Sequence, residues 1–411
     1  MDIEILTIGT ELLLGFTVDT NGAEIAQLLA PAGVRVTRRT AIADDAAQIR
    51  SSITEALQRT GVVITTGGLG PTRDDITRKT VADLFGLPLE FQESIWQELL
   101  ARFARFGRTL AESNRCQAEV PQGATVLPNR RGTAPGLWIE GAQGTVIMLP
   151  GVPIEMRLLL GQEVVPRLER RASGSVIQSR TIRTSGIAES SLADLLGDIE
   201  PAIAPVTLAY LPGFEGVDLR VTAWNLPGEE AGRRLALAAD RIRSAAAKYI
   251  YGEGTSDLAA VIIDEARRRR HRIAVAESCT GGLLGGRITA IPGSSDVFDG
   301  GVIAYRDEVK LEHLGVDAGL IRAHGAVSQP VCEAMVRGVA TRFRTDLAMA
   351  ITGIAGPDGG SAEKPVGLVW FASLADGMTR VQSFVFPGNR EEIRARAAQS
   401  TLFQLYEAIR A

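Results

Sequence analysis

The first part of the chain alternates short β-branched runs with segments whose apolar residues recur at helical spacing. Residues 3–8 and 62–66 predict strands, and the second run is typical of a strand buried on both faces. Residues 21–29 predict a helix, and a further helix is expected from about Asp75, after a glycine-rich loop. The repeated order of strand, loop and helix predicts an α/β domain built on a parallel sheet.

The pattern changes after about residue 170. Residues 180–184 and 218–224 predict strands, while 189–196 and 228–248 predict helices that pack on them. No cluster of catalytic residue types stands out here. We expect this stretch to be a small α+β connecting module.

From about residue 255 the alternation of strands and helices returns. Strands are expected at 272–276, 302–305 and 347–351, and residues 366–374 and 380–386 alternate like paired strands before a long closing helix. We therefore predict an α/β protein with two independent α/β domains, at 1–169 and 255–411, joined by the α+β module at 170–254.

Composition limits the class of protein. The 411 residues are 45% hydrophobic and 22% charged, as in a globular protein. No apolar run approaches the roughly 18 residues of a membrane helix. The acidic start at residues 1–4 differs from a secretory signal. We expect a cytoplasmic protein.

Charge and metal-ligating residues exclude further classes. Forty-four basic and 48 acidic side chains give a net charge of −4, so direct nucleic-acid binding is not expected. The arginine run at 267–270 falls in the last turn of a predicted helix, where cations favour the helix dipole. Three well-separated cysteines exclude a CxxC zinc site and a disulfide framework, and only three histidines are present.

The glycine-rich loop of the first domain has the composition of a phosphate site. Gly67, Gly68 and Gly70 let a ligand approach the backbone, and the following helix N-terminus favours an anion. Asp74 and Asp75 either cap that helix or hold a divalent cation that bridges to phosphate oxygens. Glu11, after the first strand, is a candidate partner for such a cation. Neither a Walker A loop nor a dinucleotide-binding glycine motif follows the strand.

The third segment carries a candidate nucleophile. Ser278 joins a predicted strand to a helix, where it acts either as a nucleophile or as a helix cap. The shortage of histidines argues against a Ser-His-Asp triad, so the base must be a residue such as Tyr305 or Lys310. Lys310 could instead pair with a substrate phosphate, and Cys279 is a rival nucleophile.

The first 165 or so residues resemble the molybdopterin-binding-like domain of the CinA (competence/damage-inducible) family. The resemblance is carried by GTELLLG at 9–15, DTN at 19–21, TTGGLGPTRDD at 65–75, NRCQA at 114–118, GTAPG at 132–136 and LPGVPIEM at 149–156. It implies a metal-dependent ADP-ribose pyrophosphatase that uses Mg²⁺ or a Co²⁺-like cation and is assisted by K⁺. Asp74 and Asp75 are the expected metal ligands. The expected substrate contacts are Thr10, Glu11, Asn21, Gly67, Gly68, Leu69, Gly70, Asn129 and Pro135.

Residues from about 255 to the end resemble the C-terminal domain of the same family, a nicotinamide mononucleotide (NMN) deamidase. The resemblance is carried by AESCTGG at 276–282, PGSS at 292–295, GGVIAY at 300–305, GAVS at 325–328, TGIAGPDGG at 352–360 and KPVG at 364–367; Leu368 stands where Thr is expected. It implies hydrolysis of NMN to nicotinate mononucleotide and ammonia without a metal, in a homodimer. Ser278 is then the nucleophile, activated by Tyr305 and Lys310, with an oxyanion held by the backbone N–H of Cys279 or Thr280. The further expected substrate contacts are Cys279, Thr280, Gly281, Arg287, Thr352, Gly353, Gly356 and Lys364.

Two functional hypotheses follow. In the first, the chain is a bifunctional hydrolase of NMN and ADP-ribose, both of which are products of NAD breakdown. In the second, the N-terminal domain binds a pterin or nucleotide without catalysis, in a protein of competence or the DNA-damage response. Metal-dependent turnover of ADP-ribose separates them.

Overall fold

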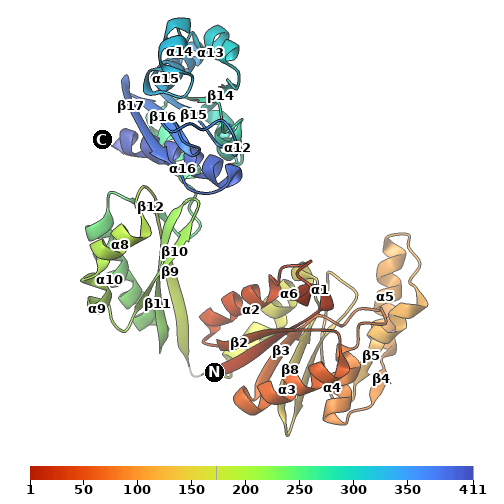
Figure 1. The fold of residues 1–411 in the computed structure, drawn as a ribbon. Helices are drawn as coiled ribbons and strands as arrows, with labels where there is room; N and C mark the ends of the chain where they lie inside the picture. Colours follow the sequence, from red (N-terminus) through yellow and green to blue (C-terminus); the bar gives the residue numbers. More distant parts are fainter. Residues whose placement is uncertain (173, 411) are drawn as a thin grey trace. The chain divides into compact units, whose positions relative to one another are not determined.

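The computed structural model describes residues 1–172 and 174–410 (Figure 1). These residues form two compact units. One contains Met1–Gln178 with Ala223–Arg233, and the other contains Ser179–Thr222 with the chain from Arg234 onward.

The first unit is built on a six-stranded sheet. Its order is β2 (Arg35–Ile42), β1 (Asp2–Ile8), β3 (Val62–Thr66), β8 (Gly144–Leu149), β7 (Gly136–Gly141) and β6 (Thr125–Leu127). The first four strands are parallel, whereas β7 and β6 are antiparallel to their neighbours. The parallel sheet expected from the sequence is thus extended at this edge by two antiparallel strands, because the short connection between β7 and β8 allows only antiparallel pairing.

Helices cover both faces of this sheet (Figure 1). Ile64 of β3 belongs to one apolar cluster and its neighbour Val63 to the other, which confirms a strand buried on both faces. One face is covered by α2 (Asn21–Leu29), α6 (Pro153–Leu159) and α7 (Val165–Glu169), and the other by α3 (Ala46–Thr60) and α4 (Thr77–Phe85). The remaining elements are α1 (Thr10–Leu13), η1 (Ala30–Ala32), β4 (Leu89–Phe91), α5 (Glu93–Arg105), η2 (Glu112–Ala118), β5 (Glu119–Pro121) and the π-helical turn η3 (Leu160–Val164).

The connecting module has a four-stranded sheet. Its order is β10 (Thr207–Gly213), β11 (Gly216–Pro227), β9 (Ser175–Thr184) and β12 (Ile250–Glu253). Its helices are α8 (Glu189–Leu196), α9 (Ile199–Ala202) and α10 (Gly228–Ala246). The module packs against the closing helix of the chain, where Tyr406 donates to the backbone oxygen of Ile250 over 3.0 Å.

The C-terminal domain has a five-stranded sheet. Its order is β14 (Phe298–Ile303), β13 (Ile273–Glu277), β15 (Leu347–Gly353), β16 (Leu368–Ala375) and β17 (Met378–Val385). The first three strands are parallel and the last two antiparallel. The helices are α11 (Leu258–Arg269), α12 (Leu283–Thr289), the short η4 (Ser294–Asp296), α13 (Asp307–Leu314), α14 (Ala318–His324), α15 (Gln329–Phe343) and α16 (Arg390–Arg410).

The two faces of this sheet also carry separate apolar clusters. Val275 and Met349 pack under α11 and α16, while Ala274 and Ala348 pack under α15 (Figure 1). The predicted fold class, two α/β domains with a small α+β module between them, is confirmed. No helix in the described part of the chain is both long and apolar enough to span a bilayer.

Candidate functional site

Three parallel strands of the C-terminal domain end at one edge of the sheet, where ligands bind in open α/β sheets. Beyond β13 lies Ser278, beyond β14 lies Tyr305, and near the end of β15 lies Thr352. These residues line a cavity of about 270 Å³. The other residues that line it are Cys279, Asp307, Lys310, Ala326, Val327, Gly353, Ile354, Ala355, Gly356, Asp358, Gly359 and Arg390.

Ser278 is held in place by the ends of two strands. Its backbone N–H donates to the carbonyl of Ile351 over 2.9 Å, and its side chain is buried. The preceding Glu277 carboxylate accepts hydrogen bonds from the N–H groups of Gly282, Leu284 and Gly285 at 2.8 to 3.0 Å. Glu277 rather than Ser278 therefore caps α12, which leaves the serine hydroxyl available to a ligand.

The backbone beyond Ser278 offers donors. Among the described residues, the N–H groups of Cys279 and Thr280 are not hydrogen-bonded to another residue. Cys279 lines the cavity, whereas Thr280 does not. Free N–H groups beside a nucleophile can stabilise an oxyanion.

The Cys279 thiol is a poor rival to Ser278 as nucleophile. Burial raises the pKa of this thiol to about 12. Since the thiolate is the reactive form, little of it exists near neutral pH.

Lys310 is the most deeply buried charged side chain at the cavity, with 1% of its surface exposed. Its ammonium donates to the Asp307 carboxylate over 3.3 Å and to the backbone oxygen of Tyr305 over 3.4 Å. A helical separation of three residues places Asp307 and Lys310 on the same side of α13. The contact to the Tyr305 carbonyl joins the two residues that sequence analysis proposed as activators of the serine.

Arg390 lines the cavity and was not predicted from the sequence. Its guanidinium donates to the Tyr305 hydroxyl over 2.9 Å and to the backbone oxygen of Gly356 over 2.7 Å. One turn later on α16, Arg394 donates to the backbone oxygen of Thr280 over 2.6 Å. Helix α16 therefore holds the loops that follow β13, β14 and β15, and no local sequence signal reveals these contacts.

Asp307 and Asp358 also line the cavity and were not predicted from the sequence, although Asp358 lies within the TGIAGPDGG motif.

Four of the predicted substrate contacts do not line this cavity: Thr280, Gly281, Arg287 and Lys364. The Lys364 ammonium donates to the backbone oxygens of His324 and Val327 at 2.6 and 2.8 Å, so it ties down the loop that carries Val327. Gly281 has a φ of 60°, which the turn between β13 and α12 requires.

Arg287 holds the connecting module to the C-terminal domain. It donates to Gln399 over 2.6 Å and lies 3.3 Å from carboxylate oxygens of both Asp257 and Glu215. Gln399 is itself buried and donates to the backbone oxygen of Glu215 over 2.7 Å. In this structure Arg287 contacts side chains of the protein itself, and its predicted contact with a substrate anion stays a prediction.

The N-terminal candidate residues gather at the carboxyl edge of the first sheet. The Asn21 side chain donates to the Thr66 hydroxyl over 3.0 Å and to the backbone oxygen of Gly151 over 2.7 Å. A Cβ on Gly67 would lie 2.1 Å from the backbone oxygen of Ile8, so only glycine fits where β1 and β3 meet. These contacts bring the ends of β1, β3 and β8 together.

Other residues of this group are engaged in the structure itself. Thr10 donates to Asp44 through its N–H over 2.9 Å and through its hydroxyl over 3.1 Å. Asn129 donates to Glu155 over 2.7 Å and accepts from the N–H of Gly132 over 2.9 Å. Glu11 is exposed, and Leu69 and Pro135 are buried. The carbonyls of Leu69 and Gly70 contact the Arg78 guanidinium at 3.0 Å and the Cys116 sulfur at 3.8 Å, respectively.

Asp74 and Asp75 precede α4, which starts at Thr77, two residues later than expected. Asp74 is exposed, and hydrogen bonding to Thr72 lowers the pKa of its carboxyl. Asp75 accepts from the N–H of Thr72 over 2.9 Å and from its hydroxyl. No group of three or more His, Cys, Asp or Glu side chains placed to hold a metal occurs in the described residues. The pair does fit the binding of Mg²⁺ through one or two carboxylates plus substrate phosphate and water.

Three family models match the chain in succession. A probable molybdopterin binding domain matches residues 4–170, the damage-inducible protein CinA KH domain matches 179–252, and the CinA C-terminal domain matches 255–409. The fold and these models define a three-part protein in which a molybdopterin-binding-like domain, a KH-like module and a CinA C-terminal domain follow one another.

Relatives extend over the whole chain. A CinA-like protein of Gemmatimonas aurantiaca is 54% identical over 412 residues, which cover 99% of this chain and 96% of that protein. A putative competence-damage inducible protein of Symbiobacterium thermophilum is 41% identical, covering 98% of this chain and 97% of that one. The crystal structure of competence/damage inducible protein CihA from Agrobacterium tumefaciens is 40% identical, covers 38% of this chain and 94% of that one, and gives a TM-score of 0.37. The chain belongs to the CinA family.

Proposed function

We propose that the C-terminal cavity hydrolyses the carboxamide of NMN, giving nicotinate mononucleotide and ammonia. The observation that carries this proposal is that Ser278, Tyr305 and Lys310, which come from separate loops and a helix, all line one cavity. The family resemblance names NMN as substrate. The guanidinium of Arg390 at the cavity suits a substrate that carries a phosphate.

The proposed reaction proceeds through an acyl-enzyme. Lys310 is assigned the role of base and accepts the Ser278 proton while the serine oxygen attacks the carboxamide carbon. The backbone N–H of Cys279, which lines the cavity, stabilises the negative oxygen of the tetrahedral intermediate. Tyr305 passes the proton to the departing nitrogen, which leaves as ammonia. Water then hydrolyses the ester at Ser278 and releases nicotinate mononucleotide.

Substrate truncation tests the assignment of NMN. Ammonia release is measured from NMN and from nicotinamide riboside, which lacks the phosphate. We expect kcat/KM to fall at least about a hundredfold without the phosphate, because charge-assisted hydrogen bonds to it are lost. Equal rates for the two compounds would contradict a nucleotide substrate.

The proposal for the N-terminal domain is metal-dependent hydrolysis of ADP-ribose to AMP and ribose 5-phosphate. It is supported by the exposed Asp74 carboxylate, which hydrogen bonding keeps ionised, next to a loop in which Gly67 and Gly68 have φ values of 110° and 67°. Asp74 and Asp75 would hold a cation of the Mg²⁺ or Co²⁺ kind, and K⁺ would assist. When bound, such a cation polarises a phosphoryl oxygen. The loop backbone would orient the pyrophosphate.

The alternative is a binding module without turnover. A glycine loop before a helix serves binding as well as catalysis, so the two are separated by products rather than by affinity. Formation of AMP from ADP-ribose in the presence of Mg²⁺, and its loss on chelation with EDTA, would support the hydrolase. Binding of ADP-ribose without AMP formation would support the binding module.

A further inference from the structure

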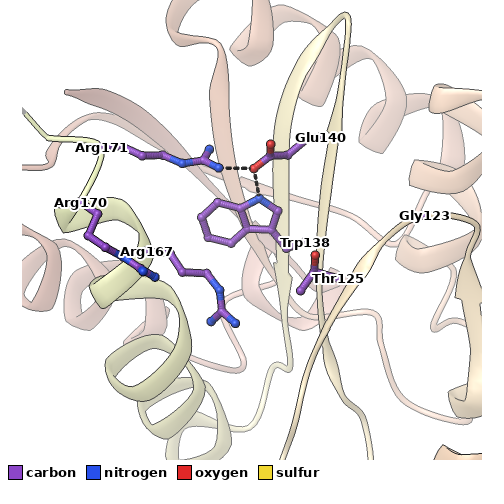
Figure 2. Close-up of a pocket in the computed structure, with 7 residues that line it drawn as sticks. All are labelled: Gly123, Thr125, Trp138, Glu140, Arg167, Arg170 and Arg171. Atoms are coloured by element: carbon purple, nitrogen blue, oxygen red, sulfur yellow. Dashed lines mark hydrogen bonds and ion pairs between the residues drawn. The ribbon is translucent and has the colours of Figure 1, made fainter.

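A second cavity, of about 560 Å³, lies within the first unit, away from the glycine loop (Figure 2). It is lined by Gly123, Thr125, Trp138, Glu140, Arg167, Arg170 and Arg171. Glu140 pairs with Thr145, the second residue of β8, so this end of the cavity lies toward the amino end of that strand. The glycine loop follows the carboxyl end of the neighbouring parallel strand β3. The cavity and the glycine loop therefore lie toward opposite ends of these strands.

The arrangement of the lining residues follows from regular secondary structure. Arg170 and Arg171 follow Arg167 by three and four residues, just beyond the end of α7, which places both near the side of the helix that carries Arg167. Thr125 and Trp138 are paired across β6 and β7, and Glu140 follows Trp138 on the same face of β7. Figure 2 shows Arg167 on α7, Arg170 and Arg171 on the turn that follows it, and Thr125, Trp138 and Glu140 on the facing strands.

Positive charge is in excess among these side chains. Arg171 donates to Glu140 and lies over the Trp138 ring at 5.1 Å, and the Trp138 indole N–H donates to the same carboxylate over 2.6 Å. Arg167 pairs with Glu163, which does not line the cavity, at 2.6 Å. Arg170 donates to the backbone oxygen of Pro166 over 3.1 Å and forms no ion pair among the described residues.

Stabilisation of the helix end explains only part of this arrangement. Cations at a helix C-terminus interact favourably with its carbonyl oxygens and dipole. That interaction does not require the arginines to face an open cavity lined by an indole, a hydroxyl and a carboxylate. A guanidinium without a carboxylate partner, at the wall of a cavity, is suited to a phosphate.

We propose that this cavity binds a small organic phosphate, of the nucleoside monophosphate class, with Arg170 and Arg171 holding the phosphate. Glu140 accepts a hydrogen bond from a hydroxyl or amino group of the remainder of the ligand. The volume lies within the range of about 300–1,000 Å³ found for small-molecule sites, and inorganic phosphate alone would fill little of it. AMP is also a product of the proposed hydrolysis of ADP-ribose, so binding to this cavity must be read through Arg170 and Trp138.

The test is calorimetric titration of the full chain with AMP and, separately, with inorganic phosphate. Arg170→Gln removes the unpaired charge, and Arg50→Gln, an exposed arginine on α3, is the matched control. We expect AMP to bind the wild type and the control equally, and Arg170→Gln to weaken binding at least about tenfold. The triple variant with Trp96→Phe, Trp224→Phe and Trp370→Phe keeps Trp138 as its one tryptophan. Its fluorescence therefore reports on the cavity alone, and AMP should change that fluorescence.

Three results would overturn the proposal. One is the absence of AMP binding to the wild type at concentrations up to about 5 mM, where millimolar affinity is measurable. Another is equal affinity of wild type and Arg170→Gln, with Trp138 fluorescence unchanged, because binding would then lie elsewhere, including at the glycine loop. The third is equal affinity for inorganic phosphate and AMP, which would leave no role for Glu140 or for the size of the cavity.

Discussion

The Arg390 guanidinium donates a hydrogen bond to the Tyr305 hydroxyl over 2.9 Å, although 85 residues separate the two in the chain. A second nitrogen of the same guanidinium donates to the Gly356 carbonyl. Tyr305 is otherwise 57% exposed at the cavity. Arg390 therefore fixes both a proposed proton carrier and the glycine loop opposite it.

Replacement of Arg390 tests this positioning. We expect Arg390→Gln to lower kcat/KM for NMN at least about tenfold, because a charge-assisted hydrogen bond to Tyr305 is lost. Arg390→Lys should recover little of this, since a compact ammonium does not reproduce the planar fork by which the guanidinium reaches the Tyr305 hydroxyl and the Gly356 carbonyl together. Steady-state kinetics provide the measurement, with Arg342→Gln on the exposed side of α15 as control. An unchanged kcat/KM for NMN in Arg390→Gln would contradict the role of Arg390 in positioning Tyr305.

Cysteine alkylation tests the assignment of the nucleophile. The pKa of Cys279 is raised to about 12, so the thiolate fraction rises about tenfold for each pH unit up to that value. Iodoacetamide labelling of Cys279, followed by mass spectrometry, should therefore be slow at pH 8 and increase through pH 10 without a plateau. Cys279→Ala should retain NMN turnover within about threefold of the wild-type rate. A labelling plateau below pH 9 would mean a reactive thiolate.

Arg287 tests the junction between the connecting module and the C-terminal domain. Arg287→Met leaves the buried Gln399 side-chain carbonyl without this donor and removes the cation that lies 3.3 Å from Asp257 and Glu215. We expect the free energy of unfolding to fall by about 1–3 kcal/mol. KM for NMN should not change, because Arg287 does not line the cavity. A raised KM with unchanged thermal stability would restore the substrate-binding role that the sequence predicted.

Asp74 tests the metal requirement of the N-terminal domain. We expect Asp74→Asn to lower Mg²⁺-dependent AMP formation from ADP-ribose at least about a hundredfold, since a carboxylate ligand is lost. Ammonia release from NMN should be unaffected, which makes it an internal control for folding. The matched variant is Asp83→Asn, at an exposed position of α4. If Asp83→Asn loses as much activity as Asp74→Asn, the effect is not specific to the loop.

Strands and helices with strong patterns were predictable from the sequence. The bounds of β3 and α2 are those expected, because β3 is β-branched throughout and α2 has a regular apolar stripe. The antiparallel edge of the first sheet was not expected. Strand β6 has only three residues, too few to show a period, and its pairing with β7 depends on a turn rather than on local preference.

The site was predictable where motifs follow strands. Ser278, Tyr305 and Thr352 come at or beyond the ends of adjacent parallel strands, so the topology brings them together. Arg390 could not be found in this way, because it opens a helix with no motif around it. Arg287 was predicted as an anion contact together with the residues that the family resemblance implies. Its partner Gln399 lies 112 residues away, and only the tertiary structure reveals the pair.

The central claim is that Ser278 attacks the carboxamide of NMN. Its most direct test is the simultaneous measurement of ammonia and nicotinate mononucleotide formed from NMN by the full chain and by Ser278→Ala. We predict equimolar products from the wild type and a rate at least about a thousandfold lower from the variant, as for the loss of a catalytic nucleophile. Turnover of the variant at the wild-type rate would return Ser278 to a structural role. Failure of the wild type to release ammonia from NMN would contradict the deamidase itself.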